Sequence, residues 1–132
     1  MKVSIELEEG NKLKASVRQH TLTFWQGDQE ERKKSLFSGE LLLISLGTCM
    51  MGTMLHFAEN QGYNIRTACF YLTSEETIAP TRIANIVVNA QIEADLTQVQ
   101  IDRLIRVASH CKIHNTLKKT AGVKFNLSIN KQ

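Results

Sequence analysis

Apolar and polar residues alternate along the first part of the chain. Apolar side chains occupy every second position in 3–7 and again in 13–17, with Glu9, Gly10 and Asn11 between the two stretches. A period of two around turn residues predicts a hairpin with one buried face. A third strand is predicted over 21–25. The stretch 26–39 is polar and dense in charge, and it predicts an exposed loop.

A long apolar run follows that loop. Residues 41–58 carry no formal charge, Ser38 can cap a helix and Gly62 can end it, so a helix over about 39–60 is predicted. A run of this length also meets the threshold for a membrane span. The rest of the chain is amphipathic and needs a partner for its apolar faces. We therefore interpret the run as a buried central helix, with no membrane involved.

Period-two patterns return in the second half and predict strands over 64–73 and 82–93, with Pro80 in the turn between them. Thr97 and Gln100 have capping-box spacing and predict the start of a helix, and a short helix is predicted at about 113–120. Apolar residues predict a last strand at Val123, Phe125, Leu127 and Ile129. The order of elements predicts an α+β fold with a mainly antiparallel sheet.

Composition bounds the class of protein. The length of 132 residues predicts a single domain over 1–132. The 16 basic and 13 acidic residues are spread along the chain, so no large basic face is predicted for nucleic acid. The N-terminus lacks the apolar core of a signal peptide. Three cysteines form no even framework, which fits a reducing cytoplasm.

Two cysteines have settings that suggest redox chemistry. Cys49 lies inside the apolar run, where most neighbours cannot solvate a charge. Cys111 lies where one predicted helix stops and another starts, between His110, Lys112 and His114. A thiol near a helix N-terminus with cationic neighbours should have a lowered pKa, and the thiolate is the reactive form. A lone cysteine on an apolar helix is more often a small core side chain.

Other residues near these cysteines offer further candidate chemistry. Helical spacing places Thr53 on the face of Cys49, where its hydroxyl could donate to a thiolate, and places His56 two turns away, too far for a general base. Cys69, on a predicted strand, is interpreted as packing. A zinc site could use Cys111, His114 and His110, with Cys49 as fourth ligand, yet only one short ligand pair exists, so no metal is predicted.

Two segments carry a resemblance to a known family. The stretch from Gly39-Glu40-Leu41 to Gly47-Thr48-Cys49, followed later by His110-Cys111-Lys112-Ile113-His114-Asn115-Thr116-Leu117, resembles the OsmC/Ohr family of osmotically inducible and organic-hydroperoxide-resistance proteins. The preceding Arg18-Gln19-His20-Thr21-Leu22-Thr23-Phe24 is similar to the family's strand before the active-site loop. The likeness covers nearly the whole chain in order.

The resemblance implies an intertwined homodimer in which sheets wrap two long central helices. It implies a thiol peroxidase without a cofactor, in which Cys49 attacks the O–O bond of an organic hydroperoxide and becomes a sulfenic acid. Cys111 would resolve that acid to a disulfide, which a dithiol donor would reduce. Sulfenic acids condense readily with nearby thiols.

The chain also departs from the better-known peroxidase members. Their central helix opens with a Pro-Glu pair whose Glu falls at the place of Gly39 here, and Glu40 lies one position later. Their arginine in an early turn has no counterpart in that turn, so Arg18 and Arg32 are the candidate substitutes. The proline often found after the second cysteine is Lys112. These departures leave an alternative open, a dimer with little or no activity that binds a small apolar or acyl ligand near Cys49.

Overall fold

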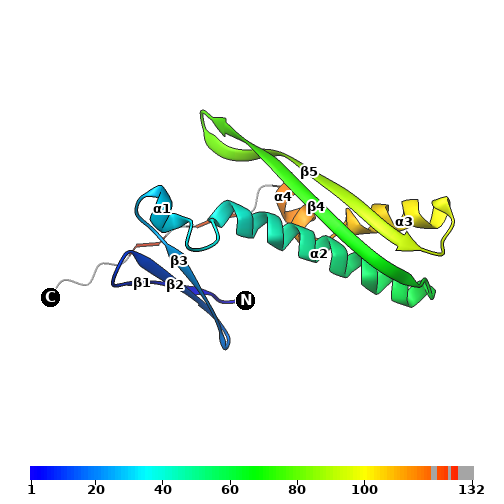
Figure 1. Cartoon of the computed structure of the whole chain (residues 1–132), viewed down its shortest axis with the longest axis horizontal. Coiled ribbons are helices and arrows are strands. Elements are labelled where there is room, and N and C mark those ends of the chain that lie inside the picture. The colour runs from blue at the N-terminus through cyan, green and yellow to red at the C-terminus, as the bar shows by residue number, and fades with distance from the viewer. Residues whose placement is uncertain (120–121, 125, 128–132) are drawn as a thin grey trace. The chain divides into compact units, whose positions relative to one another are not determined.

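The computed structural model describes residues 1–119, 122–124 and 126–127. Its elements form two compact units, Met1–Ile44 and Ser45–Gln132, with the long helix α2 running across the boundary. The predicted α+β class is confirmed, because antiparallel sheets accompany a long helix (Figure 1). The prediction of one domain over 1–132 stays a prediction.

The first unit holds a three-stranded antiparallel sheet in the order β1-β2-β3, formed by β1 (Ser4–Glu8), β2 (Lys12–Val17) and β3 (His20–Trp25). The register pairs Ile5 with Ala15 and Ala15 with Leu22, so the alternating apolar residues fall on one face. All three strands match the predicted positions. The prediction that this face is buried is wrong for a single chain, because Ile5 and Leu22 are exposed.

The segment 26–39 was predicted to be a loop. It contains the short helix α1 (Gln29–Arg32), so this prediction is only partly right. The Asp28 side chain caps this helix by accepting from the backbone N–H of Glu31 at 2.9 Å. Lys33 and Lys34 also pair with Glu30 and Glu31, one turn earlier. The stretch does remain largely exposed.

The long helix α2 spans Ser38–Gln61, within two residues of the prediction at each end. Gly62 follows with a φ of +71°, the left-handed conformation that ends many helices. This helix is long and apolar enough to cross a membrane by length and composition, with a mean hydropathy of 1.7. It buries only one side within the chain, through Leu46, Gly47, Met50, Met54 and Ala58. The prediction of a buried central helix is therefore only partly confirmed within one chain.

The second unit is built on a two-stranded antiparallel hairpin, β4 (Ile65–Ile78) and β5 (Thr81–Ala94), both longer than predicted. The inward face of the hairpin packs against the buried core, and its members are Ala68, Phe70, Leu72, Ile86, Val88 and Ile92. One close approach fixes the packing of α2 on β4, because a Cβ at Gly47 would lie 2.9 Å from Leu72 Cδ1. The hairpin lies along α2 in Figure 1.

Two further helices complete the second unit, α3 (Gln98–Ala108) and α4 (Lys112–Lys118). The predicted capping box of α3 is confirmed, since Thr97 Oγ1 accepts from Gln100 N and Gln100 Oε1 accepts from Thr97 N. Leu104 and Ala108 of α3 are fully buried against α2. The chain then turns through His110 into Cys111, the N-cap residue of α4.

The predicted last strand lies partly outside the described residues. Phe125 and Ile129 belong to the part that the structure does not describe. Val123 and Leu127 are described, and neither belongs to a strand.

Candidate thiol site

Cys49 and Cys111 are in contact through their thiols in the second unit. Cys49 lies midway along α2 and is half-buried, while Cys111 is 1% exposed and belongs to the core. Each thiol shifts the pKa of the other, so the two side chains lie close together. Both thiols are free.

The start of α4 surrounds this pair with backbone N–H groups. The first N–H groups of a helix have no partner inside the helix and need one outside it. Those of Lys112 and Ile113 lie near the Cys49 thiol and lower its pKa. The next N–H, from His114, donates to Cys111 Sγ at 3.3 Å. One turn of backbone thus serves both sulfur atoms.

The pKa values of the two thiols are shifted in opposite directions. The Ile113 N–H, the largest influence, holds the pKa of Cys49 below its usual value, and the Cys111 thiol and the Lys112 charge act in the same direction. Burial raises the pKa of Cys111 above its usual value, against the His114 hydrogen bond. Cys49 is therefore the thiol that ionises first.

The prediction that Cys111 has a lowered pKa was therefore wrong. Its sequence neighbours suggested a thiolate among cations, but Cys111 is buried in the core. The imidazoles of His110 and His114 instead bond carbonyls at the end of α3, on Arg106 and Ser109 respectively. The lowered pKa belongs to Cys49, whose apolar sequence context had suggested only shelter.

Comparison with known proteins gives the family of the chain. The family model of OsmC-like proteins matches residues 31–128. The chain belongs to the OsmC-like family. No match was found among curated proteins.

Solved structures similar to this OsmC-like chain share its fold at low sequence identity. An OsmC-like protein from Mycoplasma pneumoniae is 20% identical with a TM-score of 0.80, covering 90% of this chain and 87% of its own. A putative osmotic stress induced and detoxification response protein from Psychrobacter arcticus is 13% identical, with a TM-score of 0.75 and coverages of 88% and 87%. An OsmC-like hydroperoxide resistance protein from Jannaschia is also 13% identical, with a TM-score of 0.59 and coverages of 98% and 92%.

The other two predicted site residues of this OsmC-like protein belong to the first unit. Glu40 lies in the first turn of α2, and its Oε1 accepts from the backbone N–H of Phe37 at 2.7 Å. This bond satisfies one of the unpartnered N–H groups at the helix start. Arg18 lies between β2 and β3 with a φ of +52° and is exposed. Roles for Glu40 and Arg18 at the thiols stay predictions.

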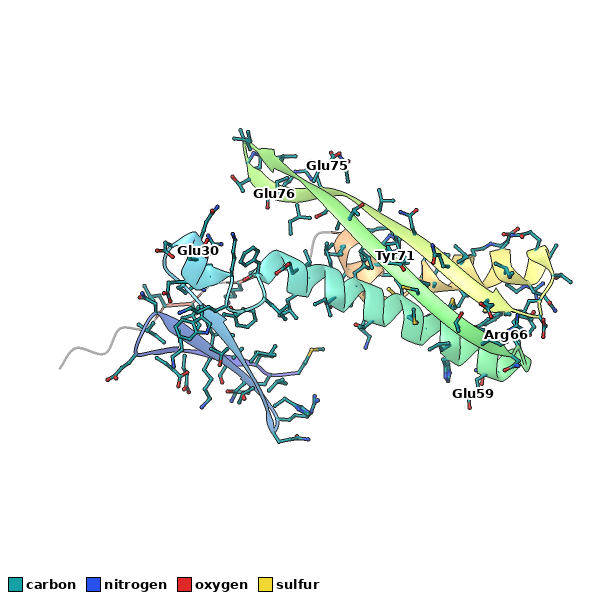
Figure 2. All side chains as sticks on the ribbon, viewed as in Figure 1. Glu30, Glu59, Arg66, Tyr71, Glu75 and Glu76 are labelled. Carbon is teal, nitrogen blue, oxygen red and sulfur yellow. The ribbon has the colours of Figure 1, made fainter. Side chains whose placement is uncertain are left out.

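Three further residues near the cysteines have other partners than the sequence suggested. The Thr53 hydroxyl donates to the carbonyl of Cys49 at 2.9 Å, as helix geometry favours, and not to the thiol. His56 is exposed, and its ring lies 3.4 Å from Asn60 Nδ2. Cys69 is exposed, so its interpretation as packing was wrong. Its thiol raises the pKa of Tyr71, which Figure 2 shows on β4.

The zinc alternative was also examined in the structure. Among residues 1–119, 122–124 and 126–127, no group of three or more His, Cys, Asp or Glu side chains could hold a metal ion.

The sequence did not point to the amides of Lys112 and Ile113 as site groups. A helix start at this place was predicted, but only packing of α4 on α2 brings these amides to a side chain more than sixty positions earlier. A helix beginning next to a candidate cysteine is the signal that could have found them.

Proposed function

We propose that the chain is a thiol-dependent peroxidase that reduces organic hydroperoxides without a cofactor. The observation that carries the proposal is the closeness of the Cys49 and Cys111 thiols at the start of α4, where backbone N–H groups lower the pKa of Cys49. Such donors stabilise a thiolate, which is the nucleophilic form of cysteine. Membership of the OsmC-like family supports the same activity.

Cys49 is the peroxidatic residue in this proposal. Its thiolate attacks the distal oxygen of ROOH, the O–O bond breaks, and the alkoxide takes a proton and leaves as ROH. Cys49 then carries a sulfenic acid. The Cys111 sulfur attacks the sulfenic sulfur, water leaves, and a Cys49–Cys111 disulfide forms. A dithiol donor reduces this disulfide by thiol exchange and is itself oxidised to a disulfide.

The surroundings of Cys49 support an organic rather than an inorganic peroxide. Cys49 packs against a cluster of apolar side chains, with Met50 beside it buried in the core and Ile113 partly buried. An apolar wall favours a substrate with an alkyl or aryl group, since binding removes that group from water. Organic hydroperoxides carry such a group and hydrogen peroxide does not.

Lys112 supplies the positive charge in the proposed site. Its charge acts on the Cys49 thiol and lowers the thiol pKa. It stands at the position where the sequence departs from the proline of better-known members. We propose that Lys112 does in part what an arginine does in those members. Arg18 and Glu40 remain weaker candidates.

A homodimer in the cytoplasm completes the proposal. Apolar side chains remain exposed on one face of the first sheet, with Leu7 81% and Ile5 59% accessible, and Leu55 is exposed on α2. Exposed apolar surface of this kind marks interaction sites. A second copy of the chain would cover these residues.

The test is a steady-state assay with cumene hydroperoxide and a dithiol reductant. We expect turnover for the wild type, at most 1% of it for Cys49→Ser, and unchanged turnover for the matched control Cys69→Ser. Equal rates for wild type and Cys49→Ser would refute the assignment of Cys49. A wild type that consumes no peroxide would favour the alternative, a ligand-binding dimer.

A further inference from the structure

A cavity of about 480 Å³ lies in the second unit, among α2, β5, α3 and α4. It is lined by side chains of α2, β5, α3 and α4 and by Ser109 after α3, and neither Cys49 nor Cys111 is among them. Its volume falls within the roughly 300–1,000 Å³ typical of small-molecule sites. The cavity therefore has the size of a ligand site separate from the thiols.

Most of the cavity wall is apolar. Leu46 and Met50 of α2 form one part of it, Ile86 and Val88 of β5 another, and Leu117 of α4 a third. Leu46 and Met50 are buried, whereas Leu117 is 42% exposed, so the wall runs from the core to the surface. An apolar chain entering along this wall would leave water at each step.

Three polar residues of the lining, Ser109, His114 and Lys118, lie after α3 or on α4, and a fourth, Asn85, lies on β5. His114 and Lys118 are four residues apart and share one side of α4. The His114 ring bonds the carbonyl of Ser109, which lines the cavity as well. Because a carbonyl only accepts, Nδ1 of His114 carries the hydrogen of that bond. The bond holds the ring in place beside Lys118.

The polar end of the cavity carries the positive charge of Lys118. None of the described residues that line the cavity is Asp or Glu. Within the part of the chain that the structure describes, the Lys118 ammonium makes no ion pair or side-chain hydrogen bond, in contrast to Lys33, Lys34 and Arg66. Glu75 bonds the Asn85 amide at 2.7 Å, but only Asn85 belongs to the lining.

We propose that this cavity binds an amphipathic carboxylate, with the acyl chain along the α2–β5 wall and the carboxylate at Lys118. An ammonium beside an apolar wall complements a ligand that has one negative charge and one apolar tail. The site does not depend on the proposed peroxidase activity, since it uses neither cysteine.

The test is calorimetric titration of the full-length protein with sodium octanoate. We expect saturable binding, and amide shifts in a ¹H–¹⁵N spectrum centred on 83–88 and 114–118. Lys118→Ala should weaken binding by about fivefold, as loss of one ion pair allows. Lys119→Ala removes the same charge one position outside the lining and should leave the affinity unchanged. Cys49→Ser should also bind as wild type, which separates this site from the peroxidase proposal.

Two probes and one further variant make the assignment falsifiable. Octanol tests the charge and acetate tests the tail, and both should bind at least fivefold more weakly than octanoate. Ala84→Phe, or Ala84→Leu if the first does not fold by circular dichroism, fills the cavity and should abolish binding. The proposal is overturned if octanoate does not bind, if Lys118→Ala binds as wild type, or if octanol binds equally well. A second copy or the end of the chain occupying the cavity would give the first of these results.

Discussion

At the scale of single residues, the acidity of Cys49 depends on backbone N–H groups more than on charged side chains. The Ile113 N–H is the largest influence on the pKa of Cys49, ahead of the Lys112 charge. A fixed amide needs no reorganisation when charge develops on the sulfur. The reactivity of the thiol therefore rests on where α4 begins.

The lowered pKa of Cys49 predicts a pH profile for alkylation by iodoacetamide. A thiol pKa below the ordinary value moves the half-maximal rate to lower pH than for free cysteine, because thiolate forms earlier. We expect Cys49 to react first in the wild type. Peptide mapping of the alkylated protein at several pH values measures this. Faster reaction of the buried Cys111 at neutral pH would contradict the assignment.

Lys112→Gln should move that profile to higher pH by a fraction of a unit, since one charge is lost while the amide remains. Lys119→Gln, with the same loss of charge at the other end of α4, serves as the control and should leave the profile in place. An unchanged profile in Lys112→Gln would remove that side chain from the site.

The sequence singled out both cysteines, but it predicted the lowered pKa for Cys111, whereas the structure gives it to Cys49. Local neighbours of Cys111 are cationic, and local neighbours of Cys49 are apolar. In the fold, Cys111 turns into the core as the N-cap of α4, while Cys49 meets the amides of a distant helix. Contacts between segments far apart in the chain decided both outcomes, and no local pattern records them.

At the scale of elements, the close packing of α2 on β4 depends on Gly47. A methyl group there would meet Leu72 at 2.9 Å, whereas a methyl group at Gly52 would meet no atom within 4 Å. Both residues lie inside the same helix. Alanine substitutions at Gly47 and Gly52 can therefore be compared directly.

Gly52→Ala should raise the free energy of unfolding by up to about 1 kcal/mol, the usual gain in helix propensity. Gly47→Ala should be less stable than Gly52→Ala by about 1–3 kcal/mol, because its methyl overpacks the contact with Leu72. Urea unfolding of both variants measures the difference. Equal stabilities would show that Leu72 moves aside without cost.

Elements with clear local signals were predicted well. The capping box at Thr97 located α3, and the alternation of apolar residues located the strands. The helix α1 was missed, although Asp28 three residues before Glu31 is a capping signal. Four residues are too few to show a helical period, so the many charged residues of the segment led to the prediction of a loop.

At the scale of the whole molecule, apolar surface left exposed by one chain supports the proposed dimer. We predict that the wild type sediments as a dimer and that Leu7→Lys, together with Ile5→Lys, shifts it to monomers. These changes place charge on the exposed sheet face. Lys14→Glu, on the same sheet at a polar position, is the control. Analytical ultracentrifugation gives the masses, and a wild-type monomer would refute the proposal.

The central claim is that peroxide oxidises Cys49 and that Cys111 then forms a disulfide with it. Its most direct test is mass spectrometry of peptides from the protein after one equivalent of cumene hydroperoxide, with free thiols blocked by alkylation. We predict a Cys49–Cys111 disulfide in the wild type and a Cys49 sulfenic acid, trapped by dimedone, in Cys111→Ser. Peroxide that leaves both thiols open to alkylation, or a disulfide that joins Cys69 instead, would contradict the account.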